Sequence, residues 1–280
     1  MAGNARRRIF GALMTGATYG AAALAILPLA AILGMLIVKG AGSLDWNFFT
    51  KSAVPLGESG GGFAHAIAGT LIIVGLACAI GVPVGVGAGI YLAEFGSQRY
   101  GWLVRFVADT LNGVPSIVIG IFAWTWIVRP AGKFTAFAGG VALACILAPI
   151  VARTTEEMVR LVPNSLREAA LALGYPRWRT SLTVVVRTAG AGIITGCMVA
   201  VARVAGETAP LLFTALGNQF FSTHLFEPMA ALPLQIYVYA VGPYDEWHRQ
   251  AWAGALVLIL LVLILGTVAR VAARSRSQRA

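Results

Sequence analysis

The sequence predicts an all-α integral membrane protein with six transmembrane helices. Of its 280 residues, 58% are hydrophobic and only 11% are charged, whereas a soluble domain has roughly a quarter of its residues charged. The apolar residues gather into blocks of about twenty, the length of helix that crosses the hydrocarbon core of a bilayer. The net charge of +10 lies in short stretches between these blocks, so membrane topology explains it better than nucleic-acid binding does.

The predicted spans lie near residues 15–38, 66–94, 111–128, 135–152, 190–215 and 251–270. The first span is too long to be the apolar segment of a cleaved signal peptide. The predicted divisions of the chain are an N-terminus 1–14, the first span 15–38, an external loop 39–65, a core domain 66–270 and a tail 271–280.

The basic residues predict the direction of these spans. An even number of spans places both termini on one side of the membrane. Outside the spans, fifteen of the 21 Lys and Arg residues fall on that side, five fall on the other, and Arg203 lies within a span. The positive-inside rule therefore predicts that both termini are cytoplasmic.

Glycine and proline predict how two of the spans are shaped. Gly81, Gly85 and Gly89 recur every four residues in the second span, so one helix face there permits close approach by another helix. Pro115 and Ser116 mark a bend in the third span, where the Ser hydroxyl is able to satisfy a freed carbonyl.

The segment 153–189 is predicted to be the longest cytoplasmic connection and to contain a short helix. Ser165 and Glu168 fit a capping box at the start of that helix. Gly174 fits a left-handed cap at its end, and Pro176 follows as a stop.

The apolar positions of this short helix follow the spacing of a single face. They are Leu166, Ala169, Ala170 and Leu173. Two interpretations stay open from the pattern alone: the face docks on a partner protein, or it packs on the protein's own helices or on lipid headgroups.

Arg203 and Glu207 lie one helical turn apart inside the apolar run Ile193–Leu216. A charged side chain costs at least ~2.5–3.5 kcal/mol to insert at such a depth, which favours a functional role. Arg203 offers a permanently charged, planar fork to an oxyanion, and this predicts a polar pathway. The alternative is an ion pair that holds helices together, either between the two residues or with a partner subunit.

The short cytoplasmic helix carries a family motif. Glu168-Ala-Ala-Leu-Ala-Leu-Gly174 resembles the EAA-xxx-G signature of ABC importer permeases, although the Pro that usually follows it is replaced by Arg187. In that family the helix is a coupling helix that inserts into a groove of the ATPase subunit. The resemblance implies that Glu168, Ala169, Ala170 and Gly174 serve ATPase coupling.

Three longer blocks within residues 66–270 resemble the PstA-type permease subunits of bacterial phosphate ABC importers. They are Asp109–Phe122, Ala202–Ala215 with its Gly-Glu-Thr-Ala-Pro core, and Glu227–Tyr237. The resemblance implies a type I ABC importer (MetI-like) fold with five core spans and one extra N-terminal span. It also implies a substrate pathway that includes Ser116, Arg203, Glu207 and Thr208.

The same resemblance implies a heteromeric complex in the bacterial cytoplasmic membrane that imports inorganic phosphate. Its other members are a PstC-like second permease, two PstB-like ATPase subunits and an extracytoplasmic, PstS-like phosphate-binding protein. ATP and Mg are expected in the ATPase and no cofactor in this chain. Phosphate keeps a proton near neutral pH and sulfate has none, so Glu207 is able to accept a hydrogen bond from phosphate and to repel sulfate.

Other function classes fit the sequence less well. The three lysines lack the setting of a Walker A loop, so ATP hydrolysis is not expected and the chain is not predicted to be an enzyme. The three cysteines and two histidines, His224 and His248, lack metal-ligand spacing, so no metal site is predicted. The remaining alternatives are a permease for molybdate or sulfate and an ion-coupled secondary transporter, which usually contains an internal repeat.

The external segment 216–250 is a candidate landing surface for the binding protein.

Overall fold

The computed structural model describes residues 2–54, 60–96 and 99–277, and all regular elements in these ranges are helical. Parts of the predicted N-terminus, external loop and C-terminal tail, at residues 1, 55–59 and 278–280, lie outside the described residues. The α-helices are α1 (Ala2–Ala41), α2 (Trp46–Thr50), α3 (Ala64–Glu94), α4 (Arg99–Gly113), α5 (Ser116–Ala123), α6 (Arg129–Ala131), α7 (Ala136–Arg160), α8 (Asn164–Ala172), α9 (Arg177–Thr180), α10 (Val186–Ala205), α11 (Ala209–Thr214), α12 (Leu232–Ala240) and α13 (Asp245–Ser277). Two π-helical turns, η1 (Trp124–Val128) and η2 (Ser181–Val185), each join two consecutive α-helices into a continuous helix. The all-α prediction is confirmed.

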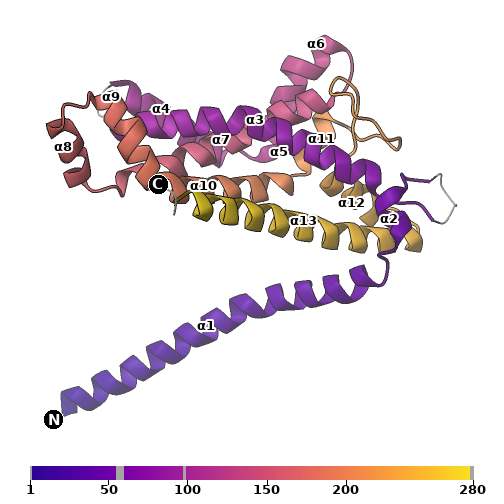
Figure 1. The fold of residues 1–280 in the computed structure, drawn as a ribbon. Helices are drawn as coiled ribbons and strands as arrows, with labels where there is room; N and C mark the ends of the chain where they lie inside the picture. Colours follow the sequence, from indigo (N-terminus) through magenta and orange to yellow (C-terminus); the bar gives the residue numbers. More distant parts are fainter. Residues whose placement is uncertain (1, 55–59, 97–98, 278–280) are drawn as a thin grey trace.

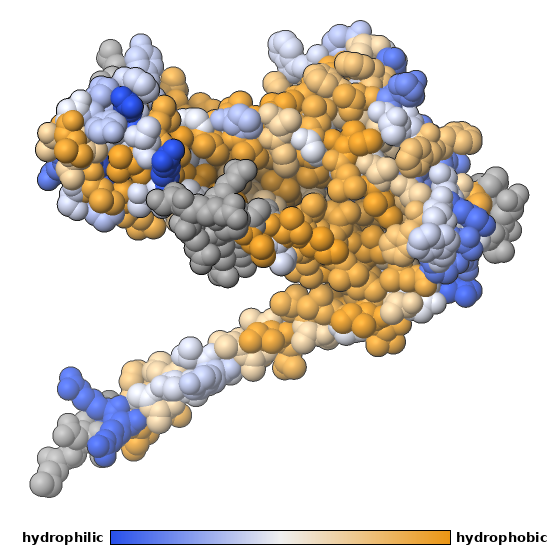
Figure 2. Space-filling view, in the orientation of Figure 1, coloured by the Kyte–Doolittle hydropathy of each residue, from blue (hydrophilic) through white to orange (hydrophobic). Residues whose placement is uncertain are grey.

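Within the described residues, five helices are long and apolar enough to span a membrane, or six if one bent pair counts as a span. Three of these helices, α1, α3 and α13, contain the first, second and sixth predicted spans, and α7 contains the fourth except for its first residue, Thr135. Figure 2 shows hydrophobic residues over the middle of the body, with hydrophilic residues gathered toward its two ends. This distribution is the one that a bilayer requires of the surface it covers.

The third predicted span is a bent pair rather than one helix. Residues Tyr100–Gly113 and Ser116–Ala131 meet at 104°, so the predicted bend at Pro115 is confirmed. The predicted start at 111 is wrong, because α4 already begins at Arg99. Proline disfavours helical geometry in the residue before it, and the helix therefore ends at Gly113.

The fifth predicted span, 190–215, is misplaced at both ends. Helix runs without a break from Arg177 to Ala205 and stops before the separate short helix α11. The predicted loop 153–189 is correspondingly shorter, since α7 continues to Arg160. Polar residues continue these helices beyond the apolar blocks, and apolar periodicity alone misses such extensions.

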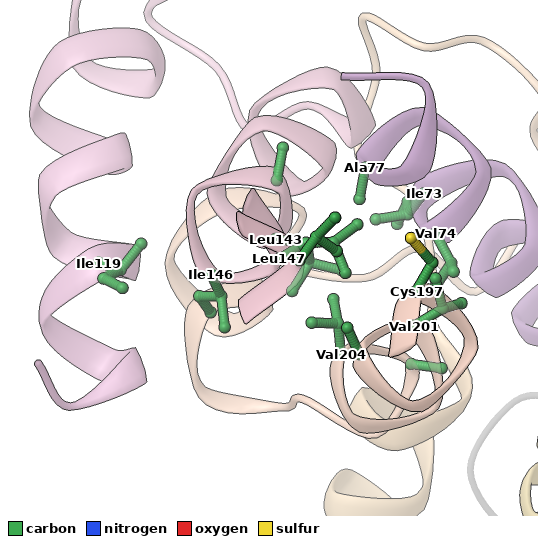
Figure 3. Packing of buried hydrophobic residues seen from close by; sticks show 14 of the residues in the cluster. Ile73, Val74, Ala77, Ile119, Leu143, Ile146, Leu147, Cys197, Val201 and Val204 are labelled. Atoms are coloured by element: carbon green, nitrogen blue, oxygen red, sulfur yellow. The ribbon is translucent and has the colours of Figure 1, made fainter. Parts of the chain in front are cut away.

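The core lies where α3 and α7 run side by side. Leu143 and Leu147 of α7 lie between α3 and α10, as Figure 3 shows. An added Cβ at Gly85 would lie 2.7 Å from the Ala148 carbonyl oxygen, and one at Gly89 would lie 2.5 Å from the Ala152 carbonyl oxygen. The prediction that the glycine stripe permits close helix packing is confirmed.

The middle of the segment 216–250, the candidate landing surface, is buried. Its residues Met229, Ala230 and Ala231 are almost fully buried, and they lead into the largely buried helix α12. The Thr70 hydroxyl of α3 accepts a hydrogen bond from the Leu232 amide at 2.7 Å. Most of the residues before Met229 and most of residues 237–249 remain at the surface, so the landing surface stays a prediction for these two parts.

Helix α1 projects from the body (Figure 1), and only 6% of the residues in its most apolar 18-residue stretch are buried. It meets the body through its last turns, where the Lys39 ammonium lies 5.1 Å from the centre of the Trp252 ring. Figure 1 also shows the start of α1 and the end of α13 toward the end of the molecule that carries α8. This agrees with an even number of crossings.

Candidate functional site

A small polar pocket lies where the bent pair α4–α5 meets α7 and the end of α10. Its volume is about 140 Å³, which is roughly ten times the space that one water molecule needs. Its polar side chains come from three segments, and they are Asn112, Ser116, Arg203 and Glu207. Ile146 and Ile150 of α7 contribute an apolar wall. The pocket therefore combines one permanent cation, one carboxyl group and two neutral polar groups in an otherwise apolar region.

The break between α4 and α5 positions two of the polar residues. Asn112 lies in the last turn of α4, and Ser116 is the first residue of α5. Pro115 between the two helices has extended backbone geometry, with φ −56° and ψ 135°. Both side chains therefore lie at the bend and reach the same pocket.

The end of α10 positions the two charged residues, and here one prediction is wrong. Arg203 is in the last turn of α10, but Gly206 caps this helix and Glu207 lies beyond it. The physical reason is Pro210, whose ring would clash with the carbonyl of Gly206 if the helix continued. The two residues therefore do not share a continuous helix face, although they line the same pocket.

The geometry also tests whether Arg203 and Glu207 form an ion pair with each other. Among the residues that the structure describes, no ion pair within 4.0 Å joins Arg203 to Glu207 or to another carboxylate. Arg203 is exposed and Glu207 is half-buried in the isolated chain. An internal ion pair is thus absent, and the guanidinium is available to a ligand or to a second protein.

The other predicted pathway residue, Thr208, does not line this pocket. It is the N-cap residue of α11, and its carbonyl oxygen accepts hydrogen bonds from the Leu211 and Leu212 amides. Asn112, by contrast, was missed by the sequence analysis. Its position could have indicated a role, because Asn112 lies four residues before Ser116, within the segment Asp109–Phe122 that resembles the phosphate permeases.

The predicted docking helix is α8, and its C-terminal cap is confirmed. Gly174 has φ +84°, in the left-handed region that glycine enters freely. The Gly174 amide donates to the Leu171 carbonyl and the Tyr175 amide donates to the Ala170 carbonyl. This pair of hydrogen bonds is a Schellman motif, which ends the helix sharply.

The predicted N-terminal capping box of α8 is wrong. The cap position is occupied by Pro163, two residues before Ser165, without a side-chain hydrogen bond, and the helix begins at Asn164. Proline suits this end because its φ is preset for the approach to a helix and its missing N–H leaves no donor unpaired there. Ser165 and Glu168 are both exposed.

The predicted apolar face of α8 is also divided. Ala170 is buried, whereas Ala169 is exposed, and Leu166 and Leu173 are 40% and 79% exposed. One side of α8 thus packs on the body, and most of its apolar side chains remain uncovered in the isolated chain.

A second charged cluster, which the sequence analysis did not predict, joins α4 to the end of α7. The Glu156 carboxylate is 2% exposed and contacts three guanidinium groups. Arg105 Nε lies 2.7 Å from it, Arg153 Nη1 3.0 Å and Arg160 Nη2 2.6 Å. Arg153 also contacts Asp109 of α4 at 3.0 Å. The role of Glu156 was not predicted, because residues 153–160 were assigned to a loop and not to the end of α7.

Metal ligation finds no support in the part of the chain that the structure describes. No group of three or more His, Cys, Asp or Glu side chains gathers there in a way that suits a metal ion. Cys78, Cys145 and Cys197 are free thiols in the apolar helices.

The sequence is similar to that of known transport proteins. Residues 85–279 match the family model described as binding-protein-dependent transport system inner membrane component. The chain is 48% identical over 243 residues to the phosphate transport system permease protein PstA of Yersinia pestis, covering 86% of this chain and 82% of that protein. The PstA protein of Haemophilus influenzae is 46% identical over 265 residues, which cover 94% of each chain.

Solved structures show the same fold at low sequence identity. A chain of a bacterial alginate ABC transporter, solved with an alginate-bound periplasmic protein, matches with a TM-score of 0.66 and 13% identity, covering 95% of this chain and 94% of that one. A chain of the inward-facing MetNI methionine ABC transporter matches with a TM-score of 0.56 and 18% identity, covering 77% of this chain and 93% of that one. The MetI-like permease fold is thus confirmed.

Proposed function

Because this chain belongs to the family of binding-protein-dependent transport system inner membrane components, we propose that it is the PstA-type permease subunit of an ATP-driven phosphate importer. The observation that carries this function is the 46–48% identity to PstA proteins over most of the chain. The alternatives of a molybdate or sulfate permease and of a secondary transporter gain no support from these relatives. The chain is a transport subunit rather than an enzyme.

The pocket at Arg203 is the proposed place where phosphate meets this subunit. The guanidinium group supplies charge-assisted hydrogen bonds to phosphate oxygens. The Ser116 hydroxyl and the Asn112 amide, which line the same pocket, supply neutral donors. The apolar wall of Ile146 and Ile150 lowers the local dielectric, which strengthens each of these contacts.

Glu207 gives this pocket a means to select phosphate. As a carboxylate it accepts a hydrogen bond from the proton that phosphate retains near neutral pH. Sulfate has no such proton, so the same carboxylate repels it. Glu207 lies in the pocket without an ion-pair partner among the described residues, which supports this role.

The energy for transport is proposed to come from two ATPase subunits, which hold ATP and Mg and receive α8 in a groove. The exposed apolar side chains of α8 and the residues after it, Leu166, Leu171 and Leu173, support docking over self-packing. A PstC-like permease and a PstS-like binding protein complete the proposed complex. Glu168 and Ala169 are exposed on α8 and are thus accessible to the ATPase.

The proposed location is the bacterial cytoplasmic membrane with both termini inside. The distribution of basic residues supports this orientation. It is also supported by the start of α1 and the end of α13, which both lie toward the end of the molecule that carries α8 (Figure 1).

Reconstitution tests the proposed function. The chain is purified with the second permease and the ATPase and placed in liposomes with ATP inside and the binding protein outside. Uptake of radiolabelled phosphate that depends on ATP and resists a tenfold excess of sulfate or molybdate is the expected result. Uptake by this chain alone, or equal competition by sulfate, would contradict it.

A further inference from the structure

Arg167 of α8 makes an unusually complete set of hydrogen bonds at the base of the docking helix. Its Nε and Nη2 donate to Glu94 Oε1, at 3.1 Å and 2.9 Å. Its other contacts are the Val159 and Val162 carbonyl oxygens and the Asn164 side chain. The side chain of Arg167 is only 19% exposed and that of Glu94 only 11%. Every guanidinium donor is thus used, in a fork geometry that lysine cannot reproduce.

Glu94 extends the same cluster to a third helix. It is the last residue of α3, and its Oε2 accepts a hydrogen bond from the Ser181 hydroxyl at 2.9 Å. Ser181 is buried where α9 continues through η2 into α10. One carboxylate and one guanidinium therefore join α8 to the ends of α3 and α7 and to the first residue of η2, which leads into α10.

The helices that leave this junction lead to the phosphate pocket. Val159 and Ile150 are nine residues apart on α7, about 14 Å along the axis, and Ile150 lines the pocket. Ser181 and Arg203 are connected by uninterrupted helix, about 33 Å long. Helix α3 packs tightly on α7 through the glycine stripe, so the pair resists sliding and transmits displacement.

From this arrangement we infer that Glu94 and Arg167 are positioning residues that transmit movement of the docking helix to the phosphate pocket. The inference rests on the proposed function, because it assigns the pair to the coupling of ATP hydrolysis and transport. The pair touches neither phosphate nor ATP. It acts by holding α8 rigidly to the two helices that carry Ile150 and Arg203.

A buried ion pair alone is weak evidence for a stability role, since an apolar pair of similar volume is often equally stable. Here the bonding atoms come from separate helices that meet at one point. Loss of the pair should therefore loosen the attachment of α8 while the apolar contacts of α3 with α7 persist. The expected defect is in coupling rather than in folding.

The test uses the full reconstituted complex and compares Arg167→Gln and Glu94→Gln with the wild-type chain. Phosphate uptake and binding-protein-stimulated ATP hydrolysis are measured on the same preparations, and the ratio of phosphate moved to ATP hydrolysed is the readout. Arg187→Gln and Glu157→Gln are matched controls, because both residues are exposed. The expected result is at least a fivefold fall in the ratio for both variants, and no change for the controls.

An unchanged ratio in assembled Arg167→Gln and Glu94→Gln complexes would overturn the inference, as would a proportional loss of uptake and hydrolysis. If Arg167→Gln fails to assemble, Glu94→Gln decides by the same criterion. Arg167→Lys should give an intermediate ratio, because an ammonium group reaches Glu94 without satisfying the other acceptors. Failure of the wild-type complex to import phosphate would instead contradict the proposed function.

Discussion

Arg105 Nε donates a hydrogen bond to Glu156 Oε1 at 2.7 Å, which links α4 to α7 across 51 residues of sequence. Arg105 also donates to the carbonyl oxygens of Leu92 and Gly96 at the end of α3. A single guanidinium thus connects three helices near the cluster of Glu94 and Arg167. These contacts hold the first part of α4 against α3 and α7, and the last turn of α4 lines the pocket.

Replacement of Glu156 with Leu should destabilise the protein strongly. Three guanidinium groups would lose their shared, buried partner, and removal of one partner of a buried pair costs about 3–5 kcal/mol. Asp109→Asn is the control, because Asp109 is 55% exposed and exposed pairs contribute about 0–1 kcal/mol. Thermal unfolding in detergent measures both, and equal midpoints for the two variants would contradict the prediction.

Replacement of Arg203 with Lys should keep the charge and still reduce phosphate uptake. Lysine lacks the planar fork that binds two phosphate oxygens at once, and the loss of one charge-assisted hydrogen bond is worth about 1.5–3 kcal/mol. Uptake at limiting phosphate should therefore fall roughly tenfold or more. Equal uptake at matched expression and assembly would remove Arg203 from the pathway.

Replacement of Asn112 with Leu should weaken phosphate uptake moderately. One neutral hydrogen bond contributes about 0.5–1.5 kcal/mol, so the half-saturating concentration should rise roughly two- to twelvefold. Thr110→Ala on the same helix is the control, since Thr110 is exposed and its hydroxyl donates only to the Phe106 carbonyl. A similar effect of both substitutions would show that the loss is not specific to the pocket.

Replacement of Gly174 with Val should uncouple ATP hydrolysis from the binding protein. A β-branched residue is strained at φ +84°, so the Schellman end of α8 should unravel and change the docking surface. Gly174→Asn is the matched control, because Asn tolerates left-handed geometry. Binding-protein-stimulated ATPase activity is the measurement, and normal stimulation of the Val variant would count against the role of this cap.

Replacement of Gly85 with Ala should loosen the packing of α3 on α7. The new methyl group would lie 2.7 Å from both the Ala148 carbonyl oxygen and the Val151 Cβ, and such overpacking costs about 1–3 kcal/mol. Gly87→Ala on the same helix is the control, because no atom lies within 4 Å of its added Cβ. Thermal unfolding should separate the variants, and the Gly87 variant should match or exceed the wild type.

Local chemistry explains which features the sequence predicted. Pro115, Gly174 and the Gly81–Gly85–Gly89 stripe each impose a conformation or a close approach through their own covalent structure. Their bend, cap and packing were predicted correctly. Of the four predicted pathway residues, Ser116, Arg203 and Glu207 line the pocket and Thr208 does not, while Asn112 lines it without having been predicted.

The wrong predictions concern features that depend on neighbours distant in sequence. Glu207 was placed on a helix that Pro210 terminates, an effect that requires weighing one proline against an otherwise helical pattern. Glu156 was assigned to a loop, and Arg167 was assigned to the short helix without a partner. Their pairing with Arg105 and Glu94 was not predicted, because these partners lie 51 and 73 residues away. The burial of Met229 beneath α3 is likewise a long-range contact that no local pattern contains.

The bend between α4 and α5 has a consequence for electrical insulation. Helix ends leave backbone amides and carbonyls without helical partners, and hydrocarbon cannot solvate such groups. At this break the amides of Val114 and Val118 donate to the carbonyl oxygens of Leu111 and Pro115, and the polar pocket that Asn112 and Ser116 line is next to the remaining groups. A polar opening in a membrane-spanning body is a potential route for ion leakage. The rest of the importer therefore has to seal the opposite side of the membrane whenever this pocket is open, so that the proton and potential gradients of the cell do not dissipate.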